Sequence, residues 1–114
     1  MIVSVTFYDL GMPDALDIPG DLVVLQRTRL AAQAEVEAFA AAVDERVLAE
    51  GPDPEERSVS LRWTVEDDAE LSRLRVVRDE AVLAVRAHPV IQRAFEERCW
   101  PATWQALQDA ARAQ

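Results

Sequence analysis

The stretch from Asp21 to Glu50 constrains the fold most, because it is the longest uninterrupted helical pattern in the chain. At about 100° per residue, nine of its side chains fall on one arc about a third of the way round a helix. These are Leu22, Leu25, Arg29, Ala32, Val36, Phe39, Ala40, Val43 and Val47. The stripe predicts a helix of about 30 residues with one face packed in a core.

The same stretch carries a second apolar row, roughly 140° away from the first. Its members are Val23, Leu30, Ala34, Ala41 and Leu48. A single partner helix could not cover both rows, so the pattern predicts at least two neighbours for this helix.

The ends of this helix are marked by turn residues. Asp17 or Asp21 can act as the N-cap, and Pro19 suits a first turn whose backbone donors are unpaired. Gly51 and Pro52 predict the end, since glycine can adopt a left-handed conformation and proline cannot continue a helix.

Two short segments alternate in hydrophobicity, as half-buried strands do. They run from Ile2 to Tyr8 and from Ser58 to Trp63. With the long helix between them, they could pair in parallel through a right-handed crossover. The alternative is that both are extended arms packed on the helices.

A second long helix is expected from Thr64 to about His88. The Thr64 hydroxyl can cap its start, and acidic residues follow at the positive end of the helix dipole. Pro89 disfavours a helical conformation in the residue before it. The predicted core face comprises Leu71, Leu74, Val77, Ala81, Ala84, Val85 and His88, with Val76, Leu83 and Ala87 in a separate row behind it.

The remaining residues predict two short helices, opened by Pro89 and Pro101. In the first, Val90, Ile91, Ala94 and Phe95 would face inward; in the second, Trp104, Leu107 and Ala111 recur at helical spacing. The expected fold is therefore one mostly helical domain over residues 1–114. An antiparallel hairpin of two long helices would pack against two short C-terminal helices, with one or two short strands.

The charge of the chain is unevenly placed. Its formal net charge is −9, and residues 1–56 hold 12 acidic residues against three arginines. This balance argues against nucleic-acid or anionic-membrane binding, which needs basic surface. With one cysteine and no secretory signal or long apolar run, the chain is expected to be cytoplasmic.

The residues offer little for catalysis or for binding a metal or cofactor. The three glycines are not clustered and lysine is absent, which excludes the common phosphate loops. His88 and Cys99 could form a base and nucleophile, but a capping histidine and a buried thiol are the favoured interpretation. The acidic group Glu66, Asp67, Asp68 and Glu70 is attributed to helix electrostatics. We therefore expect no enzyme activity, no cofactor and no metal site.

Several arginines fall at defined positions on the second long helix and beyond. Arg75, Arg86 and Arg93 would share a face if the helix direction continued through Pro89, and ion pairing is the favoured interpretation. Arg29 and Arg78 lie within apolar stripes. They would either extend their charged ends to the edge of the core or bind a carboxylate of a partner.

The runs DIPGDLVVLQRTRLAAQAEVEAF, ELSRLRVVRDEAVLAVRAHPVI and WQALQDAAR resemble a set of small, uncharacterised, helix-rich proteins of high-GC actinobacteria. The resemblance covers about two thirds of the chain. It implies a helical fold and carries no activity with it.

The expected function is a protein-interaction or assembly module, self-associating as a homodimer through exposed apolar helix faces. The expected partner surface comprises Trp100, Trp104, Leu107 and Arg78, because tryptophan dominates interface hot spots. The favoured alternative for the tryptophans is that both indoles cover the open end of the hairpin. The alternative function is an acidic regulator or inhibitor, antitoxin-like or a nucleic-acid mimic, that binds a basic protein.

Overall fold

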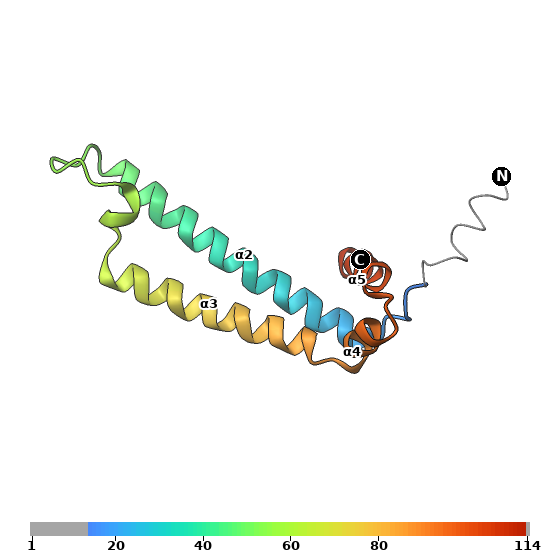
Figure 1. Ribbon diagram of the computed structural model, residues 1–114. Helices are drawn as coiled ribbons and strands as arrows, with labels where there is room; N and C mark the ends of the chain where they lie inside the picture. The colour runs from blue at the N-terminus through green and yellow to red at the C-terminus, as the bar shows by residue number, and fades with distance from the viewer. Residues whose placement is uncertain (1–13, 114) are drawn as a thin grey trace, which may run out of the picture. The chain divides into compact units, whose positions relative to one another are not determined.

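The computed structural model describes residues 14–113, which are mostly helical (Figure 1). The described elements are α2 (Gly20–Ala49), the 3-10 helix η1 (Val59–Arg62), α3 (Val65–Arg86), α4 (Pro89–Glu96) and α5 (Trp100–Arg112). The chain divides into two compact units, to which both long helices contribute. Unit 1 contains the described residues 14–28 and 81–113, and unit 2 contains residues 29–80. The expectation of a single domain stays a prediction.

The long helix predicted from Asp21 to Glu50 is confirmed to within a residue at each end. Every member of its predicted core stripe is buried or half-buried. Its first bonds go to the Pro19 carbonyl, and Asp21 lies inside the first turn, where its carboxylate accepts from the Leu22 N–H. Gly51 ends the helix with φ +89°, as its position predicted.

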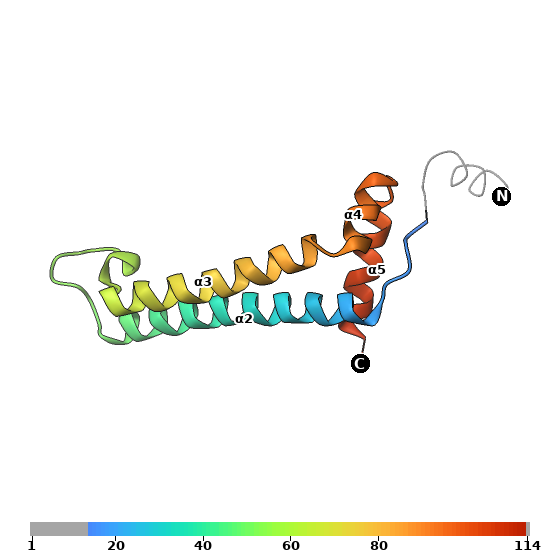
Figure 2. The ribbon, with the colours of Figure 1, turned by 90° about the horizontal axis from the view of Figure 1, so that it is seen from below.

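Within unit 2, α2 and α3 run antiparallel (Figure 2). Near the end of α2, the Arg46 guanidinium binds the carboxylate of Asp67 in the first turn of α3. Further along, Arg78 on α3 donates to the Gln33 side-chain oxygen on α2, at 3.4 Å. The two contacts are in the order that an antiparallel hairpin requires.

Asp67 also caps α3 together with Thr64. The Asp67 N–H donates to Thr64 Oγ1 at 3.0 Å, and the Thr64 N–H donates to Asp67 Oδ2 at 2.8 Å. This reciprocal pattern is a capping box with aspartate in the place of the usual glutamate, and it confirms the predicted Thr64 cap. The Arg46 guanidinium, followed by the Thr64 N–H, holds the pKa of Asp67 well below its usual range.

The strand predicted from Ser58 to Trp63 is wrong: η1 occupies this segment. The Leu61 N–H donates to the Ser58 carbonyl, and the Trp63 N–H donates to the Ser60 carbonyl. Leu61, which the alternation placed on the buried side of the segment, is exposed. Residues 14–113 also contain no strand with which this segment could pair. The other predicted strand, from Ile2 to Tyr8, lies outside the described residues.

Trp63 explains why η1 folds back onto α2. Its indole Nε1–H donates to Asp44 Oδ1 at 2.9 Å. Its ring meets Phe39 edge-on, with centroids 6.1 Å apart. These two contacts satisfy the polar and the apolar part of the indole, and they hold the connection between the helices against α2.

Unit 1 has its own core, formed by helices from distant parts of the sequence. Leu22, Val85, Ile91 and Leu107 form a buried cluster, and partly buried apolar side chains pack around it. These surrounding side chains are Ile18, Leu25, Val90, Trp100 and Trp104. Both short helices carry proline in the first turn, as predicted.

Leucine truncation tests this core with a matched control. Leu107 is fully buried, whereas Leu83 is 62% exposed in the same unit. We expect Leu107→Ala to lower the free energy of unfolding by about 2–5 kcal/mol, through lost burial and a residual cavity. Leu83→Ala should change it by less than about 0.5 kcal/mol. Equal effects in urea unfolding would contradict the placement of Leu107.

The Arg46–Asp67 pair predicts a pH dependence of stability. Because folding lowers the pKa of Asp67, its contribution is complete above the unfolded pKa of about 3.9 and is lost as the pH falls through the folded pKa. The stability difference between wild type and Asp67→Asn should therefore stay constant from neutral pH to about pH 5 and shrink below about pH 4. Urea unfolding at a series of pH values measures it. A difference that persists undiminished at pH 2 would argue against the ion pair.

Candidate protein-interaction surfaces

The four residues predicted as a partner surface have different surroundings. Leu107 is fully buried in the core of unit 1, so its assignment to the surface is wrong. Arg78 belongs to unit 2, where it binds Asp79 at 2.9 Å and Gln33. Trp100 and Trp104 remain together in unit 1, half-buried against the core cluster.

The two tryptophans continue into a stack with Phe95. The Phe95 and Trp100 ring centroids are 4.5 Å apart at an interplanar angle of 22°, and those of Trp100 and Trp104 are 5.1 Å apart at 36°. Phe95 is 53% exposed, so the prediction that it faces inward is wrong. We call Phe95, Trp100 and Trp104 the aromatic stack. The two indoles of the stack cover the core of unit 1, and its phenyl ring is exposed to solvent.

The turn between α4 and α5 produces this stack. Arg98 adopts a left-handed conformation with φ +58°, a position where glycine is preferred. Its N–H donates to the Phe95 carbonyl, and the Cys99 N–H donates to the Ala94 carbonyl. This helix-ending turn directs the chain back so that Trp100, at the start of α5, stacks on Phe95.

His88 and Cys99 are not paired with each other. The His88 Nδ1 accepts from the Val90 N–H at 3.1 Å and caps α4. Since Nδ1 accepts, Nε2 carries the proton and donates to Asp21 Oδ2 at 3.0 Å, which lowers the pKa of Asp21. Cys99 is buried, and its sulfur accepts from Thr103 Oγ1. The structure supports a capping histidine and a buried thiol.

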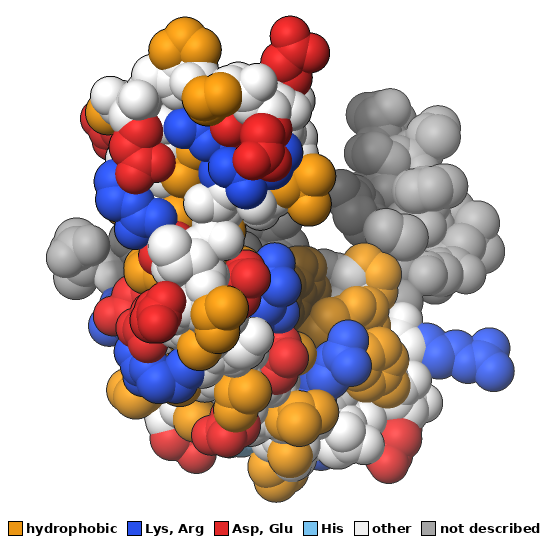
Figure 3. Space-filling view, turned by 90° about the vertical axis from the view of Figure 1, so that its left-hand side faces the viewer, with side chains coloured by type: hydrophobic (Ala, Val, Ile, Leu, Met, Phe, Trp, Pro, Cys, Tyr) orange, Lys and Arg blue, Asp and Glu red, His pale blue; other side chains and the backbone are white. Residues whose placement is uncertain are grey.

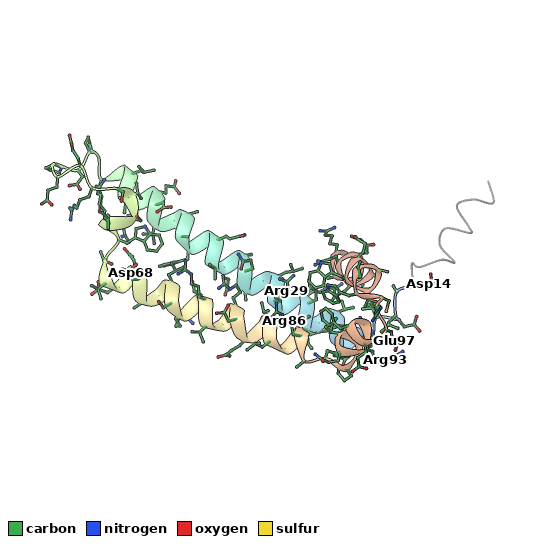
Figure 4. All side chains as sticks on the ribbon, viewed as in Figure 1. Asp14, Arg29, Asp68, Arg86, Arg93 and Glu97 are labelled. Carbon is green, nitrogen blue, oxygen red and sulfur yellow. The ribbon has the colours of Figure 1, made fainter. Side chains whose placement is uncertain are left out.

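The arginines predicted to form a stripe have different surroundings. Arg93 on α4 pairs with Glu97, the residue that follows α4, at 2.9 Å (Figure 4), in agreement with the expected ion pairing. The side chains of Arg75 and Arg86 make no hydrogen bond or ion pair with another described residue. Arg75 lies in unit 2 and Arg86 in unit 1.

A regular row of apolar and small side chains is exposed on α3 in unit 2. We define the outer face of α3 as Val65, Ala69, Ser72 and Val76, all of which are exposed. Val65 is 80% exposed and Val76 is 55% exposed. Their spacings of four, three and four residues are those of a coiled-coil seam. At 100° per residue, the row lies about 160° from the side that faces α2.

Charged residues flank the outer face of α3 on both sides. Glu66 and Arg73 lie about 80° to one side, and Asp68 and Arg75 lie about 80° to the other. Asp68 is at the start of the helix (Figure 4). Glu66, Asp68 and Arg75 make no side-chain ion pair with another described residue. Among the described residues, Arg73 forms an ion pair with Glu70 on its own helix, at 2.7 Å, and the carboxylate of Glu35 on α2 also acts on it. Glu66, Asp68 and Arg75 are therefore available to a partner, whereas Arg73 would share its guanidinium between Glu70 and a partner.

Sequence periodicity identified only part of this face. It placed Val76 in a row behind the core face, but it put Val77 inside, whereas Val77 is exposed and Arg78 is half-buried against α2. The polar residues Asp67 and Arg78 face α2, which apolar periodicity cannot detect. The second row of α2 is also largely exposed: Leu30, Ala34, Ala41 and Leu48 are open, and only Val23 is half-buried. Figure 3 shows apolar side chains interspersed with acidic and arginine side chains on the surface.

The described residues contain no group of three or more histidine, cysteine or acidic side chains placed to hold a metal ion. No helix within residues 14–113 combines the length and apolar content that crossing a bilayer requires. No protein-family model, curated protein or solved structure matches the chain. The resemblance to small actinobacterial proteins and the cytoplasmic location therefore stay predictions.

The aromatic stack predicts different roles for its members. Trp104→Ala should lower the free energy of unfolding by about 2–3 kcal/mol, because the half-buried indole covers the core. Phe95→Ala should cost about 1 kcal/mol or less, since it removes mainly one stacking contact. Chemical denaturation measures both variants. A Trp104→Ala protein as stable as wild type would show that the indole does not cover the core.

Proposed function

We propose that the chain is a protein-interaction module that self-associates and carries no catalysis of its own. The surface of unit 2 supports this most directly. Unit 2 leaves six large apolar side chains exposed, whereas only four large apolar side chains are buried there. The exposed ones are Leu30, Leu48, Leu61, Val65, Val76 and Val77; the buried ones are Val36, Val43, Val47 and Leu74. Val65 and Val76 belong to the outer face of α3, and Leu30 and Leu48 belong to the second row of α2. Apolar surface that is exposed in rows marks interaction sites.

The spacing of these rows supports a helical partner. On α3 the exposed row follows coiled-coil spacing, and a second helix of the same kind would fit against it. A second copy of the chain supplies such a helix without any other component. Since most soluble oligomers are closed and symmetric, a two-fold dimer is the expected form.

The charge of unit 2 favours a second candidate function. Residues 29–80 contain 14 acidic residues and seven arginines, which gives this unit a net charge of −7 out of −9 for the chain. Five of these arginines, Arg46, Arg57, Arg62, Arg73 and Arg78, already pair with acidic residues inside the unit. Acidic side chains therefore remain in excess, as expected of a regulator that captures a basic protein.

Sedimentation velocity at increasing protein concentration and at two salt concentrations tests the proposal. We expect a concentration-dependent shift from monomer to dimer that persists at high salt, because the contact is centred on apolar side chains and salt also screens the repulsion between two chains of net charge −9. A monomer at every concentration up to near-millimolar would contradict self-association. Binding to basic proteins that disappears at high salt would then favour the acidic regulator.

A further inference from the structure

We propose that the partner at the outer face of α3 is a second copy of the same face, docked antiparallel about a two-fold axis between Glu70 and Leu71. This inference rests on the self-association proposed above and names its surface. Two observations support it: the row of exposed side chains is complementary to itself, and so are the charges that flank the row.

The apolar row is self-complementary in this arrangement. With the axis between Glu70 and Leu71, Val65 lies opposite Val76 of the second copy, and Ala69 lies opposite Ser72 of the second copy. The two large side chains thus meet each other, and the two small ones meet at the centre, where the helices can approach closely. All four residues are exposed in the single chain and would lose solvent contact together.

The flanking charges are complementary in the same arrangement. A two-fold axis perpendicular to the helices brings the same flank of each copy together. Glu66 then lies near Arg73 of the second copy, and on the other flank Asp68 lies near Arg75 of the second copy. Each such pair is offset by two residues from level, which is about 3 Å along the helix and within reach of these side chains. The symmetry repeats both pairs, so four attractive contacts surround the apolar row.

A parallel arrangement is less favourable because of the acidic end of unit 2. Residues 44–56 contain six acidic residues and one arginine. A parallel dimer would place these two segments side by side, whereas the antiparallel dimer separates them to opposite ends of the interface. Repulsion between like charges therefore selects the antiparallel form.

The proposed interface is short, and its size limits the affinity of the dimer. Residues 65–76 span about 18 Å of helix, so the interface falls at the small end of specific interfaces. We expect a dimer with a dissociation constant in the micromolar range.

Charge reversal at one pair tests both the surface and the direction. Glu66→Arg and Arg73→Glu should each weaken dimerisation about tenfold, since each places like charges together at two symmetric contacts. An equimolar mixture of the two variants should restore wild-type affinity, because in the mixed dimer the arginine introduced at position 66 would face the glutamate introduced at position 73. A parallel dimer would instead bring opposite flanks of the two copies together. Asp68 of the second copy, rather than Glu66 of the second copy, would then lie near Arg73, so Glu66→Arg alone would have little effect.

Glu45→Arg is the matched control, since it makes the same charge change at an exposed position of α2. It lowers the net negative charge and should leave dimerisation unchanged or slightly strengthened. Glu66→Arg makes an equal change in net charge but should weaken the dimer, so net charge cannot explain the result. Thermal melting of each variant verifies that the monomer remains folded.

Val76→Asp tests the apolar row independently of the charge pairs. It should abolish dimerisation, whereas Val77→Asp, at the neighbouring exposed position away from the row, should leave it largely intact. If wild type dimerises and neither the charge variants nor Val76→Asp weakens it, self-association stands and this surface is wrong. If wild type is monomeric throughout, the proposed function itself fails.

Discussion

The orientation of α3 depends on the carboxylate of Asp67. This group closes the capping box with Thr64 and binds Arg46 near the end of α2. Because it joins the first turn of α3 to α2, it sets the rotation of α3 about its own axis. Leu71, Leu74 and Arg78 follow at positions that face α2. Val65 and Val76 are then directed to the opposite side, where no described residue covers them.

The two units differ in how they bury their apolar side chains. Unit 1 gathers four fully or nearly fully buried residues in one cluster and covers them with Trp100 and Trp104. Unit 2 has only two helices and η1, and the side facing the neighbouring helix includes the polar residues Asp67 and Arg78. A hairpin of two helices can bury one face of each helix and leaves the other face to solvent. The apolar residues on those outer faces therefore need a partner outside the unit, and this is the physical basis of the proposed self-association.

Much of the helical framework could be predicted from the sequence. The long periodic stretch before Gly51, the Thr64 cap and the two proline-initiated helices all appear as expected, because periodicity, capping and proline geometry act locally. The segment from Ser58 to Trp63 could not be predicted, since its alternation resembles a strand while Trp63 is held by tertiary contacts to Asp44 and Phe39.

The candidate surfaces were predictable only in part. Trp100 and Trp104 were correctly placed together, but Leu107, one helical turn beyond Trp104, points into the core. The exposure of Phe95 depends on the left-handed turn at Arg98, a residue type that does not signal such a turn. The outer face of α3 was missed because its inner side includes Asp67 and Arg78, and an apolar pattern assigns Val77 to that side instead.

The most direct test of the antiparallel dimer is the distance between identical spin labels on the two copies. A label at Val77 and a label at Glu80, both exposed on α3 and outside the outer face, can each be placed in a Cys99→Ala background. Pulsed dipolar spectroscopy should give a separation of at least about 20 Å for position 77 and about 30 Å for position 80, because each residue away from the axis adds about 3 Å to the axial separation. Equal distances at the two positions would indicate a parallel dimer, and the absence of dipolar coupling at both would contradict association through this face.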